Sequence, residues 1–333
     1  MSIGSGIGSS FGYKVESTWG TRAAPDKFIR HRSAQLVPMY NRVQGEGIQS
    51  GALGLRGDHL VQTHQGATAS VEFDVVTLNM LSLVKVLMGG GSSAQQGGSA
   101  AYLHTFTLAD TLTDSLTMQV NVPLRGGTDK AKEVTGAKPT SATFSCGVGE
   151  ILTSSMEFDC EYWDDSQTLA TPSYVSGVPY HFGEAALKLG TYASEAAVTG
   201  VRAFSCTIER PQDTEAYRFG QTTKQEQILN APTSITGSIE ADYIATADFE
   251  ERMTDMTLPS LVFECVGTVA TGKPAIASTY FPTWRVTVPG VHITGNQTTE
   301  GYDVPRTSWD WEWKYDGSNL PSIQIMSSET SIP

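Results

Sequence analysis

The chain of 333 residues is long enough for one large domain or two medium domains with a substantial core. Its 22 basic and 35 acidic side chains give a formal net charge of −13, which argues against a surface that binds nucleic acid through the phosphates. The longest apolar stretch, around residues 78–88, is too short to cross a bilayer. No signal peptide is visible, so we expect the chain to fold in a cytoplasm without a membrane partner.

The first 30 residues are rich in glycine and serine, and so is the stretch 88–101. Segments of this composition bury too little apolar surface to pack by themselves. We therefore predict a flexible N-terminal arm over residues 1–30 and a flexible loop over residues 88–101. Each would become ordered on contact with another subunit.

Strand signals dominate the rest of the chain, as short runs in which apolar and polar residues alternate. The clearest runs cover residues 70–76, 115–122, 155–162, 237–243, 260–266 and 284–289. Two stretches favour helix: residues 77–89, where Thr77 can cap the start and Gly89 the end, and residues 246–254. The pattern predicts an all-β fold of antiparallel sandwich or partial-barrel modules, each with one short helix.

Residues that could carry catalysis or hold a metal are scattered along the chain. The four cysteines show no CxxC spacing, and the six histidines show no HxxxH or HExxH spacing. No nucleophile elbow or Walker loop occurs. We expect reduced, buried thiols, no metal or cofactor, and no enzymatic activity.

The second half of the chain repeats the pattern of the first half. Residues 68–74 (TASVEFD) align without gaps on residues 236–242 (TGSIEAD), and a predicted helix follows each run. Further along, residues 154–162 (SSMEFDCEY) align on residues 307–315 (TSWDWEWKY). The order strand, helix, strand, strand, strand is kept in both halves while the loops change length, as loops do.

We interpret this repetition as two tandem copies of one β module. The alternative is that two all-β halves of similar composition align in this way by chance. The predicted organisation is an N-terminal arm (1–30), a first module (31–166), a connector (167–199), a second module (200–328) and a C-terminal tail (329–333).

In the aligned strands the charged residues fall on one face and the apolar residues on the other. A face made almost wholly of carboxylates is repulsive, which calls for a reason. If strands from several subunits closed a wide barrel, the acidic faces would line a pore and the apolar faces would pack against a second sheet. The candidate lumen-lining residues are Glu72, Asp74, Glu157, Asp159, Glu161, Glu240, Asp242, Asp310 and Glu312. The candidate packing residues are Phe73, Phe158, Tyr162, Tyr243, Trp309, Trp311 and Trp313.

Residues 307–316 (TSWDWEWKYD) carry three of the six tryptophans at alternate positions. Such a stripe can stack on sugars, so a carbohydrate-binding or adhesin β-sandwich that uses Trp309, Trp311 and Trp313 is the alternative function. A strand that covers a core shows the same period. The alignment of this run on residues 154–162 favours packing.

A fixed order of segments then carries a family resemblance. The Gly/Ser-rich start is followed by GIQSGALGLRGD (47–58), QGATASVEFD (65–74) with its helix, YLHTFTL (102–108), SLTMQV (115–120) and VRAFSCTIERP (201–211). In this order the chain resembles the major tail tube proteins of bacteriophages with long, non-contractile tails. The resemblance extends over roughly residues 11–328 and rests on element order and sheet pattern.

The resemblance implies a β-sandwich module whose copies close into rings, which stack into a tube. Such a tube houses the tape-measure protein during assembly and later conducts DNA to the host. Single-module members of the family form sixfold rings, so a two-module chain would form a trimeric ring with pseudo-sixfold symmetry; the sequence also leaves a hexamer open. Residues 43–60 and 88–101 would join adjacent rings.

The resemblance also implies the partners and the location. The partners would be other copies of the chain, the tape-measure protein, the tail terminator and the baseplate or distal tail proteins. DNA would contact the chain only in transit, without specific binding. The protein would be assembled in the host cytoplasm and reside in the virion tail.

Overall fold

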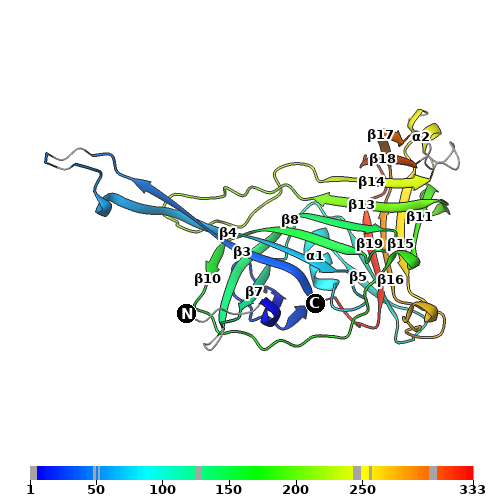
Figure 1. The fold of residues 1–333 in the computed structure, drawn as a ribbon, viewed down its shortest axis with the longest axis horizontal. Helices are drawn as coiled ribbons and strands as arrows, with labels where there is room; N and C mark the ends of the chain where they lie inside the picture. The colour runs from blue at the N-terminus through cyan, green and yellow to red at the C-terminus, as the bar shows by residue number, and fades with distance from the viewer. Residues whose placement is uncertain are drawn as a thin grey trace.

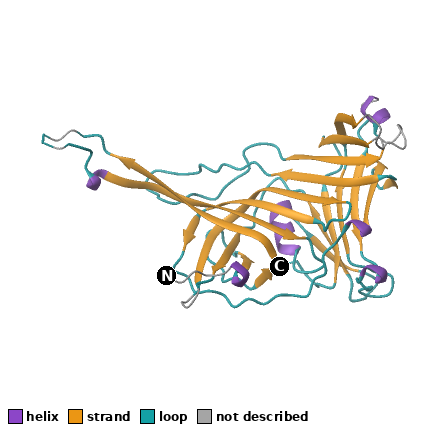
Figure 2. Cartoon of the chain, viewed as in Figure 1, coloured by secondary structure: helices purple, strands orange, loops and turns teal. Residues whose placement is uncertain are grey.

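The computed structural model of the protein describes residues 6–47, 50–51, 53–124, 129–242, 249–254, 257–299 and 306–332. Antiparallel strands dominate these residues, which confirms the predicted all-β class. Figure 1 shows a body of strands from which one long hairpin projects, and Figure 2 shows how little of the chain is helical.

The strands and helices follow one another in an order close to the predicted one. The strands of the first half are β1 (Phe11–Val15), β2 (Lys27–Ile29), β3 (His31–Gln44), β4 (Leu60–Asp74), β5 (Ser92–Gln95), β6 (Tyr102–Thr107), β7 (Leu116–Val122), β8 (Lys130–Gly147), β9 (Thr153–Cys160) and β10 (Tyr162–Asp164). The later strands are β11 (Ala185–Thr191), β12 (Ser194–Ala197), β13 (Val201–Glu209), β14 (Ser234–Asp242), β15 (Ser260–Val266), β16 (Thr283–Val288), β17 (Val291–Thr299), β18 (Arg306–Trp313) and β19 (Ser322–Ser327). The helices are α1 (Leu81–Met88) and α2 (Glu250–Thr254).

Eight strands of the larger sheet lie side by side in the order β3, β4, β9, β8, β13, β14, β18, β17. Strand β8 is long enough to pair with different strands in two parts of this sheet. Its second half pairs with β9 and β13, and its first half pairs with β7 and β10. The strand bends between these parts, where Gly136 has a φ of 63° and the register shifts between Pro139 and Ser141.

The second sheet has the order β12, β11, β15, β16, β19, β6, β5 and packs against the apolar face of the eight strands. Aromatic rings make the contact between the two sheets. Phe204 of β13 stacks on Phe263 of β15 with centroids 4.3 Å apart, and Phe144 of β8 lies 5.4 Å from Trp284 of β16. The core is therefore the layer between the sheets, as in other sandwiches.

Helix α1 adds to this core and ends where the sequence predicts. All of its residues except Lys85 are buried, and Gly89 closes it with a φ of 82°. Thr77 does not cap its start: the helix begins at Leu81, and the Thr77 hydroxyl instead accepts a hydrogen bond from the Val178 amide at 3.2 Å. Among the described residues, no helix is long and apolar enough to span a membrane.

The N-terminal segment differs from the prediction of a flexible arm. Strand β1 pairs with β7 and with β2, and the side chains of Phe11 and Tyr13 are fully buried. The alternating FGYKV run supplies the apolar surface that the surrounding Gly and Ser residues lack. Part of the predicted loop 88–101 is also ordered, because β5 pairs with β6 at the edge of the second sheet.

Candidate functional site

The face of the eight-stranded sheet that points away from the core is polar across its whole width. Residues that lie opposite one another on neighbouring strands form rows across it. One row reads Ser33, Glu72, Ser155, Thr143, Thr207, Thr236, Glu312 and His292. The next row reads Asp74, Thr153, Ser145, Ser205, Ser238 and Asp310.

Hydroxyl groups, rather than carboxylates, occupy the middle of these rows. Thr143 and Thr207 hydrogen-bond at 2.9 Å across the β8–β13 junction, and Ser205 and Ser238 do so at 2.9 Å across β13 and β14. The prediction of an almost wholly acidic face is therefore corrected to an acidic and hydroxyl-rich face. The alternating Ser and Thr of runs such as 141–145 indicate such a face, but the prediction rested on the charged residues alone.

Several of the predicted lumen-lining acids are paired with basic side chains. Arg32 lies 2.7 Å from the Asp74 carboxylate and 3.9 Å from that of Glu72. Asp242 lies 3.4 Å from Arg202 and 3.9 Å from Arg306. These pairs are partly solvent-exposed, so each contributes little to stability, but together they reduce the negative charge of the face.

Glu312 is paired with a residue just beyond the end of its own strand and with one on the neighbouring strand β17. Its Oε1 lies 2.9 Å from Lys314 Nζ and 3.4 Å from His292 Nδ1. Hydrogen bonding from Lys314, with a smaller contribution from His292, lowers the pKa of Glu312. Lys314, which breaks the acidic alternation of the sequence, therefore serves as a local counter-ion.

Four acids of this face have no ion pair within the part of the chain that the structure describes. Glu157 accepts a hydrogen bond from Ser141 at 3.4 Å, and Glu209 lies on the other side of that serine. Glu240 and Asp310 belong to the same group. Glu209 was missed by the sequence analysis because it ends its strand instead of lying inside an acidic run.

Asp159 departs from its predicted place on an open acidic wall. Its side chain is 3% exposed and forms an ion pair with Lys224, and its Oδ2 accepts a hydrogen bond from Gln227 at 2.9 Å. Residues 210–233, which connect β13 to β14, cover it. Burial raises the pKa of Asp159, and Lys224 opposes that shift.

Glu161 also departs from the predicted wall, because β9 ends at Cys160 and the chain turns there into β10. Its side chain lies beside Gly136 at the bend of β8 and close to Trp19. Burial, together with the nearby charge of Glu16, raises the pKa of Glu161 to about 7. The carboxyl is thus turned toward the corner between the two parts of the large sheet.

The pKa of Glu161 predicts a pH-dependent stability. The folded chain keeps this proton up to about pH 7, whereas the unfolded chain releases it near 4.5, so the free energy of unfolding falls as pH rises through that window. Glu161→Gln should remove this slope and stabilise the protein above pH 7 by about 1 kcal/mol, after allowance for partial exposure. Urea unfolding between about pH 5 and 8 measures it. Glu157→Gln is the control, and an unchanged slope in Glu161→Gln would refute the assignment.

The predicted packing residues divide into three groups. Phe73, Phe158, Trp309 and Trp311 are at most 3% exposed and Trp313 is half-buried, whereas Tyr162 is 38% exposed on β10 and Tyr243 lies outside the described residues. Tyr162 was misplaced because the strand turns before it. Trp309 stacks on Phe249 at 5.6 Å, so two of the three rings of the sugar-binding alternative face the core.

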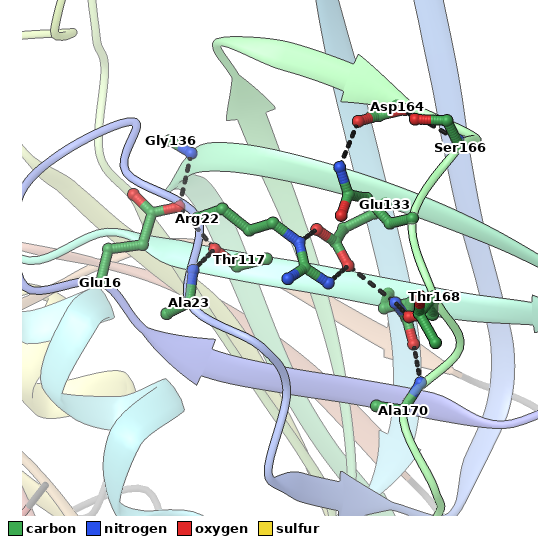
Figure 3. Close-up of polar contacts among 12 residues, drawn as sticks. Glu16, Arg22, Ala23, Thr117, Glu133, Gly136, Asp164, Ser166, Thr168 and Ala170 are labelled. Carbon is green, nitrogen blue, oxygen red and sulfur yellow. Dashed lines mark hydrogen bonds and ion pairs between the residues drawn. The ribbon is translucent and has the colours of Figure 1, made fainter.

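A second polar cluster lies behind the bend of β8 and holds the N-terminal segment (Figure 3). The buried Glu16 carboxylate accepts hydrogen bonds from the amides of Gly20 and Gly136, both at 2.9 Å, and from Ser115 and Thr117 at 2.6 and 2.8 Å. Nearby, Arg22 pairs with Glu133, which also accepts from Gln119 at 2.7 Å. Because the carboxylates of Glu16 and Glu133 are both engaged, the cluster anchors the N-terminal segment to β7 and β8.

Within the described residues, no three His, Cys, Asp or Glu side chains are placed to hold a metal ion. All four cysteines are buried and unpaired, as predicted. Among the described residues, the chain is a sandwich with a continuous polar sheet face and with an unpaired strand edge at each end of the eight-strand array, which is typical of a structural protein.

The comparison with protein families agrees with this class. The profile of the phage tail tube protein family matches residues 6–310, and the chain belongs to that family. The protein is therefore a structural component of a bacteriophage tail, built to assemble with itself into a tube alongside other tail components, and the family indicates a non-enzymatic role. No curated protein matches the chain significantly.

Proposed function

We propose that three copies of this chain close into a ring through the eight-stranded sheet, and that the polar face of this sheet lines the lumen of the tail tube. The observation that carries the proposal is a repetition inside the sheet. Its first four strands, β3, β4, β9 and β8, have the same roles in the first half of the chain as β13, β14, β18 and β17 have in the second. This repetition supports two tandem modules, near 31–166 and 200–328.

The pairing registers repeat as well as the order. Ser70 lies opposite Glu157, and the aligned Ser238 lies opposite Asp310. Independent all-β halves would share a strand order by chance far more readily than a residue-level register, because each register shift moves every side chain to the other face. The shared register thus supports a duplicated module.

The junction between the two halves supplies a template for the junction between two subunits. Inside the chain β8 pairs with β13. The equivalents of these strands are β17 and β3, which form the two ends of the eight-strand array and have no further strand beside them among the described residues. An unpaired edge of this kind pairs readily with another strand. A β17 edge joined to the β3 edge of the next subunit continues the array, and heterologous contacts of this type close into rings.

A ring of three chains would have 24 strands, three times the eight of one chain. At an ordinary strand spacing and tilt such a barrel measures roughly 45–50 Å between opposite backbones. Its wall would present Glu72, Asp74, Glu157, Glu240, Asp242, Asp310 and Glu312, together with Glu209 and the hydroxyl rows; Asp159 and Glu161 are no longer part of this set.

Such a lumen suits a conduit for DNA. Carboxylates repel phosphates, and the basic side chains of this face, such as Arg32 and Lys314, are held by neighbouring carboxylates, so DNA can pass without binding. The same lumen would house the tape-measure protein before DNA enters. The tail terminator and the baseplate or distal tail proteins would cap the stack, and assembly would take place in the host cytoplasm.

The template gives the register of the proposed junction, and this can be tested by cross-linking. Thr143 lies opposite Thr207, and their equivalents are Gln297 and Val37. With Gln297→Cys and Val37→Cys in one chain, oxidation of assembled tubes should yield covalent trimers, because opposite residues of paired strands lie within disulfide range. Denaturing gels measure the product, and negative-stain images show whether hollow rings or tubes are present.

The matched control combines Gln297→Cys with Val43→Cys, which lies six positions further along β3, roughly 20 Å away. It should assemble but not cross-link. Closed hexamers in place of trimers would refute the trimeric ring, and tubes that never cross-link at the first pair would refute the β17–β3 junction.

A further inference from the structure

In each half of the eight-stranded array a long connection joins the first two strands, and the two connections have different conformations. Glu209 lies opposite Ser234 at the end of the second pair, and the equivalent pair Met39 and Gly66 lies within the first, whose pairing continues to Gln44 opposite Leu60. Residues 40–65 (the arm) and residues 210–233 (the folded connection) therefore start and end at equivalent points and have nearly equal lengths. In Figure 1 the arm projects away from the body of strands, whereas the folded connection stays close to the body.

The folded connection begins by following β8 and then folds on itself. The Arg210 amide donates to the Thr140 carbonyl at 2.7 Å, which extends the β13–β8 pairing beyond the strand end. Its two limbs then bond to each other, with the Asp213 amide donating to the Ile228 carbonyl at 2.9 Å and the Gln225 amide to Ala216 at 2.9 Å. The segment is thus an ordered lobe on the polar side of the first module.

This lobe contacts the arm where the arm leaves the sheet. The Gln65 amide donates to the Thr222 carbonyl at 2.8 Å, and the Tyr217 hydroxyl donates to the Gln65 carbonyl at 3.4 Å. The Tyr217 ring lies against the His64 ring with centroids 4.1 Å apart. The Lys224 side chain packs on Gly66, where a Cβ would come within 2.8 Å of it.

Two buried cations fasten the lobe to the sheet beneath it. Lys224 pairs with Asp159 of β9, and both side chains are at most 3% exposed. Lys138 of β8 donates to Glu226 at 2.8 Å and to the Gln227 carbonyl at 3.1 Å. The Lys224–Asp159 pair, which is buried on both sides, holds one geometry strictly, because a displaced partner would leave a charge without compensation.

We propose that residues 210–233 are a brace that fixes the direction of the arm, with the Asp159–Lys224 pair as its anchor. A free two-stranded ribbon is only marginally stable and twists easily. From Gly66 to Leu60 the paired ribbon is roughly 20 Å long, so a swing of about 10° at its base moves the end of the paired part by about 3 Å, and points beyond it by more. The brace adds a third segment at the base, which is where an angular restraint is most effective.

The consequence for assembly rests on the proposed function: rings stack into a tube, and residues 43–60 of the arm are taken to join adjacent rings, as the family resemblance implies. Apolar side chains on the arm are exposed, among them Val43, Leu55, Leu60 and Val61 at 49–61%. A contact made by a long arm needs the tip at one place, and ordering it in advance lowers the entropic cost of joining.

The test measures the arm directly. Spin labels on Leu55→Cys in the arm and Val148→Cys in the body report their distance distribution by double electron–electron resonance; both positions are exposed, and the four native cysteines are buried. Two variants weaken the brace. Asp159→Asn with Lys224→Met neutralises the anchor without leaving a lone charge, and Tyr217→Ala removes the contact at His64.

The matched control is Glu184→Gln with Lys273→Met. This is another buried lysine–carboxylate pair, with Nζ 2.7 Å from both oxygens, and it lies outside the brace. Both brace variants should broaden the distance distribution at least twofold, while the control keeps the parent width. Distributions that stay narrow in both brace variants, or that broaden equally in the control, would overturn the proposal.

Tube length in negative-stain images separates this proposal from the function on which it rests. Shorter tubes in the brace variants are expected, since a swinging arm meets its partner less often. A variant that lacks residues 46–58 removes the arm tip and leaves the brace contacts intact. If it forms tubes of parent length, the arm does not join rings, and the distance measurement still decides whether the brace holds the arm.

Discussion

Replacing Gly237 by alanine is expected to lower the free energy of unfolding by about 3 to 5 kcal/mol. Gly237 lies in β14, opposite the fully buried Trp311 of β18. A Cβ there would come within 2.1 Å of the Ser205 carbonyl oxygen and 2.5 Å of the Trp311 ring. Neither neighbour can retreat easily, because one is the backbone of a paired strand and the other is packed between two sheets.

The first half of the chain shows how this packing problem is solved with other residues. The equivalent pair is Ala69 opposite Phe158. Alanine is larger than the glycine at position 237, and phenylalanine is smaller than the tryptophan at position 311. Gly237→Ala combined with Trp311→Phe should therefore recover about 1 to 2 kcal/mol relative to Gly237→Ala with the tryptophan retained, since the ring clash is relieved while the backbone contact persists.

Chemical denaturation of the four chains of this cycle measures the coupling between the two sites. Gly54→Ala serves as a control, because nothing lies within 4 Å of the added atom. If the second substitution adds its own cost instead of offsetting the first, the two pairs are not equivalent, and the case for a duplicated module is weakened.

A second large effect is expected at Glu16. Glu16→Ala removes an acceptor of four hydrogen bonds, including two from backbone amides, in a site where the side chain is 6% exposed. The buried donors left behind should cost about 3 to 4 kcal/mol. Limited proteolysis should then cut between β1 and β2, where Glu16 ties the chain to β7 and β8.

Glu16→Gln keeps one acceptor oxygen and is expected to lose about half as much stability, and the exposed Glu46→Ala should lose almost none. Unfolding midpoints for the three variants decide the matter. Equal effects of Glu16→Ala and Glu46→Ala would show that the hydrogen bonds accepted by Glu16 contribute nothing to stability.

The sequence predicted the strands and their two faces well, because alternation is local and each strand shows it by itself. Phe158 and Trp311 are buried, and Glu157 and Asp310 are exposed, on the faces that alternation assigns. The composition of the polar face of the eight-stranded sheet was predicted only in part. Its serine and threonine residues were missed, because hydroxyl residues are too common for their alternation to stand out.

The misplaced residues share a different cause. Asp159 has the right parity, but Lys224, which covers it, comes 65 positions later in the chain. Glu161 and Tyr162 follow a strand end that the sequence does not mark with Gly or Pro. The N-terminal strand was missed because Gly and Ser outweigh Phe11 and Tyr13 in composition, although those two rings decide the packing.

The different conformations of the two connections have a consequence for the symmetry with which rings would stack. In a trimeric ring the wall repeats six times, but the arms repeat only three times, and the positions between them carry the folded connection. Successive rings can then settle in three equivalent orientations, 120° apart, where a ring of identical modules would allow six. In the proposed ring, divergence of one connection after duplication would therefore leave the bore nearly sixfold for whatever passes through it, while it would halve the number of ways in which one ring can be set on the next.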